Sequence, residues 1–199
     1  MIKNIVFDVG RVLVTFEPAQ YLTQIGFDEV TREHILEAMF KNELWLEGDR
    51  GILSVEELVE HYIANSPTYK NEITEAFCRI GEAIEVLPHT MKWLSDLKAR
   101  GYRLFVISNY GEYTYQQTKD KLTFLQYMEG SLFSYRYKVV KPEPEIYEML
   151  LDDYHLKAEE CVFIDDSLVN VKGARAVGYH AIQFHNYEQA KEELERLLT

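Results

Sequence analysis

The chain alternates between short apolar runs and longer stretches in which apolar residues recur every three or four positions. A short apolar run bounded by polar or turn-forming residues is typical of a strand buried on both faces of a parallel sheet. Such strands are predicted at residues 3–8, 102–107, 131–137, 161–164 and 180–184. Because helical stretches separate them, the pattern predicts an α/β fold, a parallel sheet with helices on both faces.

Glycines and helical periodicity delimit the helices between the later strands. One helix around Met91–Leu97 is followed by Gly101, and residues 168–177 predict another that stops at Gly178. Residues 187–198 predict a closing helix. These helices provide the crossover connections that a parallel sheet requires.

A long helical segment interrupts this alternation after the first strand. Residues 18–82 show helical rather than strand periodicity, and residues 45–51, which include two glycines, predict a turn within the segment. We therefore predict two domains. An α/β core comprises residues 1–16 and 86–199, and a small helical cap comprises residues 17–85.

Composition and charge narrow the classes of function. The 199 residues are 47% hydrophobic and 27% charged, which is ordinary for a globular protein. The formal net charge of −12 argues against nucleic-acid binding, which depends on neutralising phosphates with Lys and Arg. No apolar run approaches the ~18 residues of a membrane span and no signal peptide is indicated, so we expect a cytoplasmic protein with no membrane partner.

The two cysteines, Cys78 and Cys161, form no CxxC pair. Reduced, buried thiols are therefore expected rather than a disulfide. No sequence feature indicates the oligomeric state.

Four polar sites follow predicted strands or lie just past one. Asp8 ends the first strand, Ser108 follows the second, Lys141 lies in a loop after the third, and Asp165-Asp166 follows the fourth. Because sites in open parallel sheets lie at the carboxyl ends of the strands, we expect these side chains to meet. Each has a structural alternative, since Asp and Ser are common in turns and helix caps and a lysine before proline is usually at the surface.

Phosphoryl transfer uses this set of groups. A carboxylate can attack phosphorus and form an aspartyl-phosphate, which divides one difficult step into two. A hard divalent ion such as Mg²⁺ prefers carboxylate and carbonyl oxygens and offsets the repulsion between nucleophile and phosphate. A hydroxyl and a lysine can hold the remaining phosphate oxygens.

Four motifs resemble, in order, those of the haloacid dehalogenase-like (HAD) hydrolase superfamily. They are Asp8-Val9-Gly10-Arg11-Val12, Ser108-Asn109, Lys141-Pro142 and Asp165-Asp166-Ser167. The resemblance covers nearly the whole chain and implies a Rossmann-like core, with the helical insertion similar to the small cap domain of that superfamily. Within it, the chain is most similar to sugar-phosphatase-like enzymes with a short helical cap.

The resemblance implies a catalytic role for several matching residues. Asp8 is expected to be the nucleophile, and Lys141 to stabilise the negative charges of Asp8 and of the phosphate. Ser108, with Asn109 beside it, is expected to bind the transferring phosphoryl group.

The same resemblance implies Mg²⁺ as the cofactor. Asp8 and Asp166 are expected to ligate the ion, with help from Asp165, and the backbone carbonyl of Gly10 is expected to complete the ligand set.

Two further residues are candidate substrate contacts. Arg11 neighbours Gly10 and points either at the leaving group or at solvent, and Trp45 lies in the cap. A tryptophan at helical spacing is more often a core residue, which is the alternative for Trp45.

The chain departs from the superfamily pattern at two positions. Phosphatases of this superfamily usually carry a second Asp two residues after the nucleophile as general acid and base, where this chain has Gly10. General acid–base catalysis is typically worth ~10²–10⁴-fold, so we expect a slower enzyme, or one in which water or the substrate moves the proton. Asn170 stands where many relatives have an Asp near the metal.

The predicted function is Mg²⁺-dependent hydrolysis of a small phosphorylated metabolite, a sugar phosphate for example, through an aspartyl-phosphate on Asp8. One alternative is a C–halogen hydrolase in which Asp8 attacks carbon; this chemistry needs no metal, so the pair Asp165-Asp166 argues against it. The other alternative is a binding or regulatory protein that binds phosphorylated ligands through a weakened catalytic site. The reason to consider it is Gly10, which stands where the general acid and base usually is.

Overall fold

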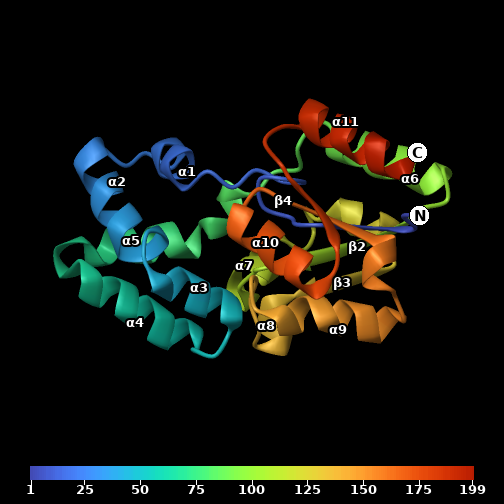
Figure 1. Ribbon diagram of the computed structural model, residues 1–199. Helices are drawn as coiled ribbons and strands as arrows, with labels where there is room; N and C mark the ends of the chain where they lie inside the picture. Colours follow the sequence, from blue (N-terminus) through green and yellow to red (C-terminus); the bar gives the residue numbers. More distant parts are fainter.

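A computed structural model describes all residues, 1–199, and contains one parallel sheet of five strands in the order β3-β2-β1-β4-β5 (Figure 1). The strands are β1 (Asn4–Phe7), β2 (Arg103–Ser108), β3 (Gly130–Phe133), β4 (Cys161–Asp165) and β5 (His180–Gln183). The five strands lie at the predicted places, each end within a few residues of the prediction. The predicted α/β fold with a parallel sheet is therefore confirmed.

The central strand β1 is buried on both faces, as its uninterrupted apolar run requires. It pairs with β2 on one side and with β4 on the other. Ile5 and Phe7 contribute to one hydrophobic cluster and Val6 to another, because successive side chains of a strand point to opposite faces. The chain direction carries Asp8, directly after β1, to the carboxyl edge of the sheet.

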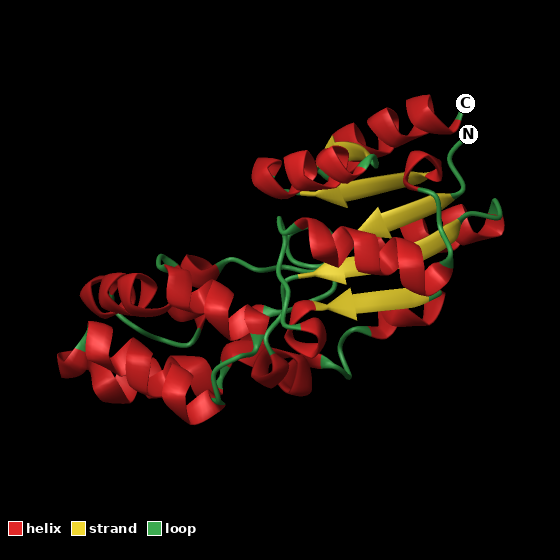
Figure 2. Ribbon diagram, turned by 60° about the horizontal axis from the view of Figure 1, so that its bottom comes forward, coloured by secondary structure: helices red, strands yellow, loops and turns green.

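Helices cover both faces of the sheet (Figures 1 and 2). α6 (Thr90–Ala99) and α11 (Tyr187–Leu198) contribute Trp93 and Leu194 to the cluster that contains Ile5. α9 (Pro144–Tyr154) and α10 (Leu168–Val177) pack in the cluster that contains Val6. The bounds of α10 and α11 coincide with those predicted. None of the helices combines the length and hydropathy of a membrane span.

The segment after β1 forms a helical lobe beyond the carboxyl ends of the strands, where the arrowheads point in Figure 2. Its α-helices are α1 (Pro18–Gln24), α2 (Glu29–Ile35), α3 (Glu43–Arg50), α4 (Val55–Asn65) and α5 (Lys70–Cys78). A cluster of 12 buried hydrophobic residues lies within this lobe and is separate from those of the sheet. We retain the division into a core of residues 1–16 and 86–199 and a cap of residues 17–85 as a proposal.

The two connections between lobe and sheet pair with each other. The backbone N–H of Thr15 donates to the carbonyl of Glu85 at 2.8 Å, and that of Leu87 donates to the carbonyl of Leu13 at 3.0 Å. The lobe therefore joins the sheet through a paired two-chain connection rather than a single free linker.

Three local predictions are wrong. Residues 45–50 belong to helix α3 rather than to a turn: the side chain of Asn42 caps its start, and Gly51, at φ 72°, ends it. Strand β3 stops at Phe133, and the remainder of the predicted strand is helix α8 (Ser134–Tyr137), where the Ser134 hydroxyl bonds the loop after β2 at Tyr110 and helix α3 at Asp49.

The third concerns the cysteines: both are free and Cys161 is buried, but Cys78 is exposed at the end of α5.

Helix α10 packs closely on the loop that carries Lys141. A Cβ at Gly173 would lie 3.0 Å from the backbone oxygen of Pro142, tighter than nearly all real contacts. We expect Gly173→Ala to lower the free energy of unfolding by about 1–3 kcal/mol through overpacking, although alanine is the better helix former. Urea unfolding checks this, with exposed Lys172→Ala in the same helix as control, and a stabilised Gly173→Ala would contradict the close contact.

Candidate active site

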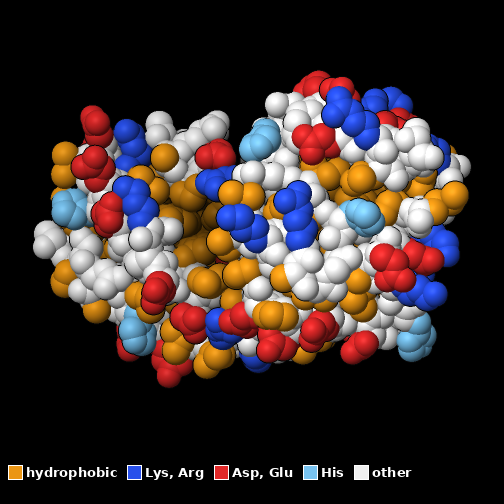
Figure 3. All heavy atoms as spheres, viewed as in Figure 1, with side chains coloured by type: hydrophobic (Ala, Val, Ile, Leu, Met, Phe, Trp, Pro, Cys, Tyr) orange, Lys and Arg blue, Asp and Glu red, His pale blue; other side chains and the backbone are white.

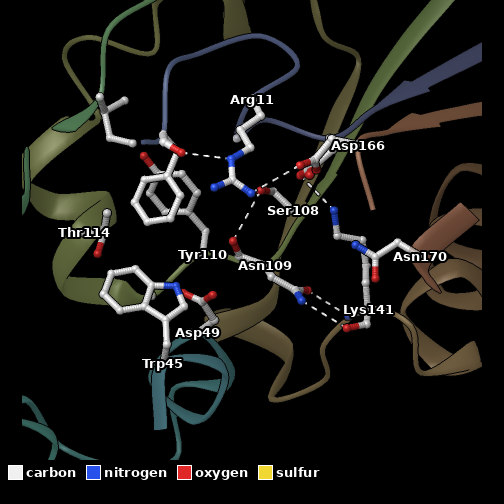
Figure 4. Close-up of a pocket in the computed structure, with 15 residues that line it drawn as sticks. Arg11, Trp45, Asp49, Ser108, Asn109, Tyr110, Thr114, Lys141, Asp166 and Asn170 are labelled. Carbon is white, nitrogen blue, oxygen red and sulfur yellow. Dashed lines mark hydrogen bonds and ion pairs between the residues drawn. The ribbon is translucent and has the colours of Figure 1, made fainter. Parts of the chain in front are cut away.

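The polar residues at the strand ends meet at a cavity of about 140 Å³ between sheet and helical lobe. Figure 3 shows a hollow there, with hydrophobic side chains deep inside it and basic side chains beside it. The residues that line the cavity include all but one of the predicted site residues: Asp8, Gly10, Arg11, Trp45, Ser108, Asn109, Lys141 and Asp166 (Figure 4). The exception, Asp165, lies behind the cavity wall and is fully buried.

A buried charge cluster forms the floor of the site. The Lys141 ammonium lies 2.8 Å from an oxygen of Asp8 and 2.6 Å from an oxygen of Asp165. Lys141 is 2% exposed, Asp8 8% and Asp165 0%, so water screens these charges poorly. Lys141 therefore fixes Asp8 against Asp165 at the junction of β1 and β4.

Burial and charge act in opposite directions on these groups. Burial raises the pKa of Asp8 to about 7, while the Lys141 ammonium opposes the rise. Burial acts to lower the pKa of Lys141, but Asp165 and Asp8 together raise it above its ordinary value, so this lysine stays charged. A cation near Asp8 would favour its ionised, nucleophilic form.

The oxygens of Asp165 are already used by protein donors. Besides Lys141, Asp165 accepts from the backbone N–H of Ser167 at 2.8 Å and from the side-chain amide of Asn170 at 3.1 Å. Asn170, one of the two departures from the superfamily pattern, thus holds Asp165. With these contacts, Asp165 is well placed to hold Lys141 in position.

Other oxygens at the cavity fit a hard cation. Oxygens of Asp8, Asp165 and Asp166 lie within 4.8 Å of one another. One oxygen of the Asp8 carboxylate accepts from both Lys141 and the Val9 N–H. The other Asp8 oxygen has no protein donor, and neither has the Gly10 carbonyl. Burial raises the pKa of Asp166, a cost that a bound cation would offset. These oxygens fit the preference of Mg²⁺.

The loop after β2 faces this cluster. The Ser108 hydroxyl is buried, and its only hydrogen bond is a long one, 3.5 Å to the carbonyl of Asn109, so it is free to donate to an anion. The Asn109 amide donates to the Lys141 carbonyl at 3.0 Å and accepts from the Lys141 N–H at 2.7 Å. Asn109 therefore joins the end of β2, which carries Ser108, to the loop that carries Lys141.

Arg11 and Trp45 lie at the upper and lower left of the cavity in Figure 4. Arg11 has φ 60°, and its guanidinium donates to the carbonyl of Phe16 at 3.0 Å and lies 3.5 Å from Asp166. The Trp45 ring packs against Phe40 and Phe16 with centroids 4.6 and 5.6 Å apart. The cavity thus has a basic group beside the Asp166 carboxylate and an aromatic wall at Trp45.

Sequence reasoning missed Asp49, a buried carboxylate of the helical lobe that lines the same cavity. Reading residues 45–51 as a turn hid it. Its sequence signal is the pair of flanking glycines, because a Cβ at Gly48 would meet Leu58 at 2.8 Å and one at Gly51 would meet Tyr135 at 3.0 Å. Small residues at these positions let this stretch pack against the rest of the protein. Thr114 was missed too and also lines the cavity.

A parallel sheet whose central strand ends in a buried carboxylate, beside a lysine and a pair of acidic residues, provides the groups that covalent catalysis by a carboxylate requires. The family model described as haloacid dehalogenase-like hydrolase matches residues 2–178. The chain belongs to this family.

Individual relatives agree with this assignment. The D-ribitol-5-phosphate phosphatase of Bacteroides thetaiotaomicron is 25% identical over the full length of both chains. A HAD family enzyme from the same organism, solved with magnesium and inorganic phosphate, superposes with a TM-score of 0.73 at 22% identity, over 96% of this chain and 99% of that one. The L-2-haloacid dehalogenase of Xanthobacter autotrophicus has a TM-score of 0.68 at 16% identity, over 96% of this chain and 80% of its own.

The charge cluster predicts a large effect on stability. We expect Lys141→Met to lower the free energy of unfolding by about 3–5 kcal/mol at neutral pH, because it leaves two buried carboxylates without their shared cation. Urea unfolding in the absence of divalent ions measures this, with exposed Lys157→Met expected within about 0.5 kcal/mol of the wild type. A Lys141→Met protein as stable as the control would show that the cluster is not a stabilising unit.

Proposed function

We propose that this protein is a Mg²⁺-dependent phosphatase that forms an aspartyl-phosphate on Asp8. The observation that carries the proposal is the position of Asp8, which is braced by Lys141 at 2.8 Å and faces a free Ser108 hydroxyl across the cavity. A nucleophile and donors to the same small anion therefore converge from three strand ends.

Each residue has a distinct task in this proposal. Asp8 attacks phosphorus, while Lys141 and Ser108 donate to the phosphoryl oxygens as their charge changes in the transition state. Asp8, Asp166 and the Gly10 carbonyl hold Mg²⁺, which supplies positive charge that offsets the repulsion between carboxylate and phosphate. Asp165 and Asn109 position Lys141 by the contacts described above.

A small phosphomonoester, a polyol or sugar phosphate, is the proposed substrate class. The cavity of about 140 Å³ is small, and it has a basic wall at Arg11 as well as aromatic walls at Phe16 and Trp45. The relative that matches over its full length is named for D-ribitol 5-phosphate, which belongs to this class. We also propose that the protein acts in the cytoplasm.

The dehalogenase alternative shares the nucleophile and the fold. It leaves the acidic cluster of Asp8, Asp165 and Asp166 without a purpose, because displacement of halide from carbon by a carboxylate requires no divalent cation. Dependence on metal therefore separates the two reactions.

We expect hydrolysis of para-nitrophenyl phosphate that requires Mg²⁺, stops with a chelator, and falls by about 10⁴-fold or more in Asp8→Asn, since removal of a nucleophile removes the covalent route. Steady-state phosphate release measures this. The matched control is Asp153→Asn, an exposed carboxylate of α9 that leaves the site intact.

Two results would contradict the proposal. Folded wild-type protein that binds Mg²⁺ but releases no phosphate at high enzyme concentration would favour the ligand-binding alternative. Hydrolysis of a halogenated acid that persists in chelator would favour the dehalogenase.

A further inference from the structure

An alkyl phosphate needs a proton for its leaving oxygen, and the core side of the cavity offers none at Gly10. In an in-line displacement the leaving oxygen lies on the far side of phosphorus from the attacking oxygen. Asp8 contacts Lys141, and Figure 4 shows Trp45 and Asp49 of the helical lobe across the cavity from Lys141, so the far side of phosphorus faces the lobe. The donor must therefore reach the cavity from the lobe or from its rim.

Most groups around the cavity are unsuited to this task. Arg11 does not lose its proton in proteins, and Lys141 is held by two carboxylates on the nucleophile's side. The hydroxyl of Tyr110 is paired with that of Thr118 at 2.8 Å. Asp166 belongs to the proposed Mg²⁺ ligands, so Asp49 is the remaining acid that lines the cavity.

Asp49 projects from the last turn of α3 and is 8% exposed, yet no Lys, Arg or His forms an ion pair with it. Figure 4 shows its carboxylate beside Trp45, on the opposite side of the cavity from Asp166 and Lys141. It also lines an adjoining cavity of about 90 Å³ between the lobe and residues 111–114, which follow β2. Its side chain therefore lies where a leaving group would enter the lobe.

Contacts around Asp49 fix it relative to the sheet. The Ser134 hydroxyl donates to the Asp49 carbonyl at 2.6 Å and accepts from the Tyr110 N–H at 2.9 Å. The next residue, Arg50, forms a two-point ion pair with Glu143 at 2.9 and 2.7 Å. Asp49 is thus held against the core by the hydrogen bond of its own carbonyl and by the ion pair of the neighbouring Arg50.

We propose that Asp49 is the general acid and base of this enzyme, supplied by the helical lobe in place of a carboxylate at position 10; the inference rests on the phosphatase function proposed above. In the first step an oxygen of Asp8 bonds to phosphorus, the ester P–O bond breaks, and the leaving oxygen takes the Asp49 proton to give the alcohol. In the second step Asp49 accepts a proton from water, whose oxygen bonds to phosphorus. The Asp8–phosphorus bond breaks, which returns free Asp8 and inorganic phosphate.

The electrostatics of Asp49 suit both steps. Burial raises the pKa of Asp49 to about 7, and the charge of Asp8 adds to this rise, while the Gly111 N–H and Lys141 oppose it. Burial, together with the Asp49 charge, raises the pKa of Tyr62 in α4 and of Tyr110 in the loop after β2. A pKa near the working pH lets one group give a proton and later take one. Above that pKa Asp49 loses the proton that the first step needs, so the rate with a poor leaving group should fall.

The test compares leaving groups in Asp49→Asn, which keeps the shape of the side chain but removes its titratable proton. With Mg²⁺, kcat/KM for ribitol 5-phosphate should fall about 10²–10⁴-fold, while kcat/KM for para-nitrophenyl phosphate, whose leaving group needs little protonation, should stay within a few-fold of the wild type. This ratio reports the steps up to release of the alcohol, so it excludes the second step, which both esters share. The fall of the wild-type ribitol 5-phosphate rate above about pH 7 should be absent in the variant. Glu43→Gln, an exposed carboxylate in the first turn of α3, is the control and should change neither rate.

Persistent aryl hydrolysis in Asp49→Asn reports both an intact fold and the phosphatase function, whatever the result for the alkyl ester. An equal fall of kcat/KM for both esters, or no fall for either, would overturn the role of Asp49 as the acid of the first step while leaving the phosphatase proposal in place. A wild type that hydrolyses only the aryl ester would also overturn it. A wild type inactive on both would instead refute the phosphatase function on which it rests.

Discussion

The site depends on one interaction, the buried lysine between two carboxylates. Lys141 contacts Asp8 and Asp165, and all three are almost excluded from water. Two carboxylates this close would not both ionise in a dry interior without a cation between them. Lys141 offsets their repulsion and holds Asp8 in place, and its two loop contacts with Asn109 keep it there.

The topology of the sheet places the members of this cluster side by side. From β1 the chain crosses to β2 and then β3, and it returns past β1 to β4, so the direction of crossover reverses between β1 and β4. A parallel sheet opens a crevice at such a point, at the carboxyl ends of the strands. Asp8 follows β1 and Asp165 ends β4, which puts the proposed nucleophile and its supporting residues at that crevice. The helical lobe closes it and adds groups that the sheet does not supply.

The sequence predicted those parts of the molecule that local patterns determine. The apolar runs placed the strands, and Asp8, Ser108 and Lys141 could be proposed as site residues because the ends of parallel strands share one edge. Gly178 likewise placed the end of α10. Position along the chain, together with polarity, was sufficient for these features.

Local patterns do not show which distant residue a side chain bonds or how separate segments pack together. The sequence did not reveal that Asn109 bonds the backbone of Lys141, or that Asn170 bonds Asp165, because the partners are distant in the chain. The glycines around Asp49 indicated a turn, whereas they permit close packing of a helix. The third strand ends before Ser134, whose hydroxyl accepts from the Tyr110 N–H and donates to the Asp49 carbonyl, two groups that are distant in the chain.

The central claim, that Lys141 and the surrounding oxygens make Asp8 a nucleophile toward phosphorus, is tested most directly by trapping the intermediate. The enzyme would be mixed with Mg²⁺ and a slight excess of para-nitrophenyl phosphate, quenched in acid within one turnover, and digested for tandem mass spectrometry. The account predicts one phosphoryl group on the Asp8 carboxylate, which is absent when Mg²⁺ is withheld. Phosphate release with no phosphoryl group on Asp8 under any quench time, or with the group on another residue, would contradict it.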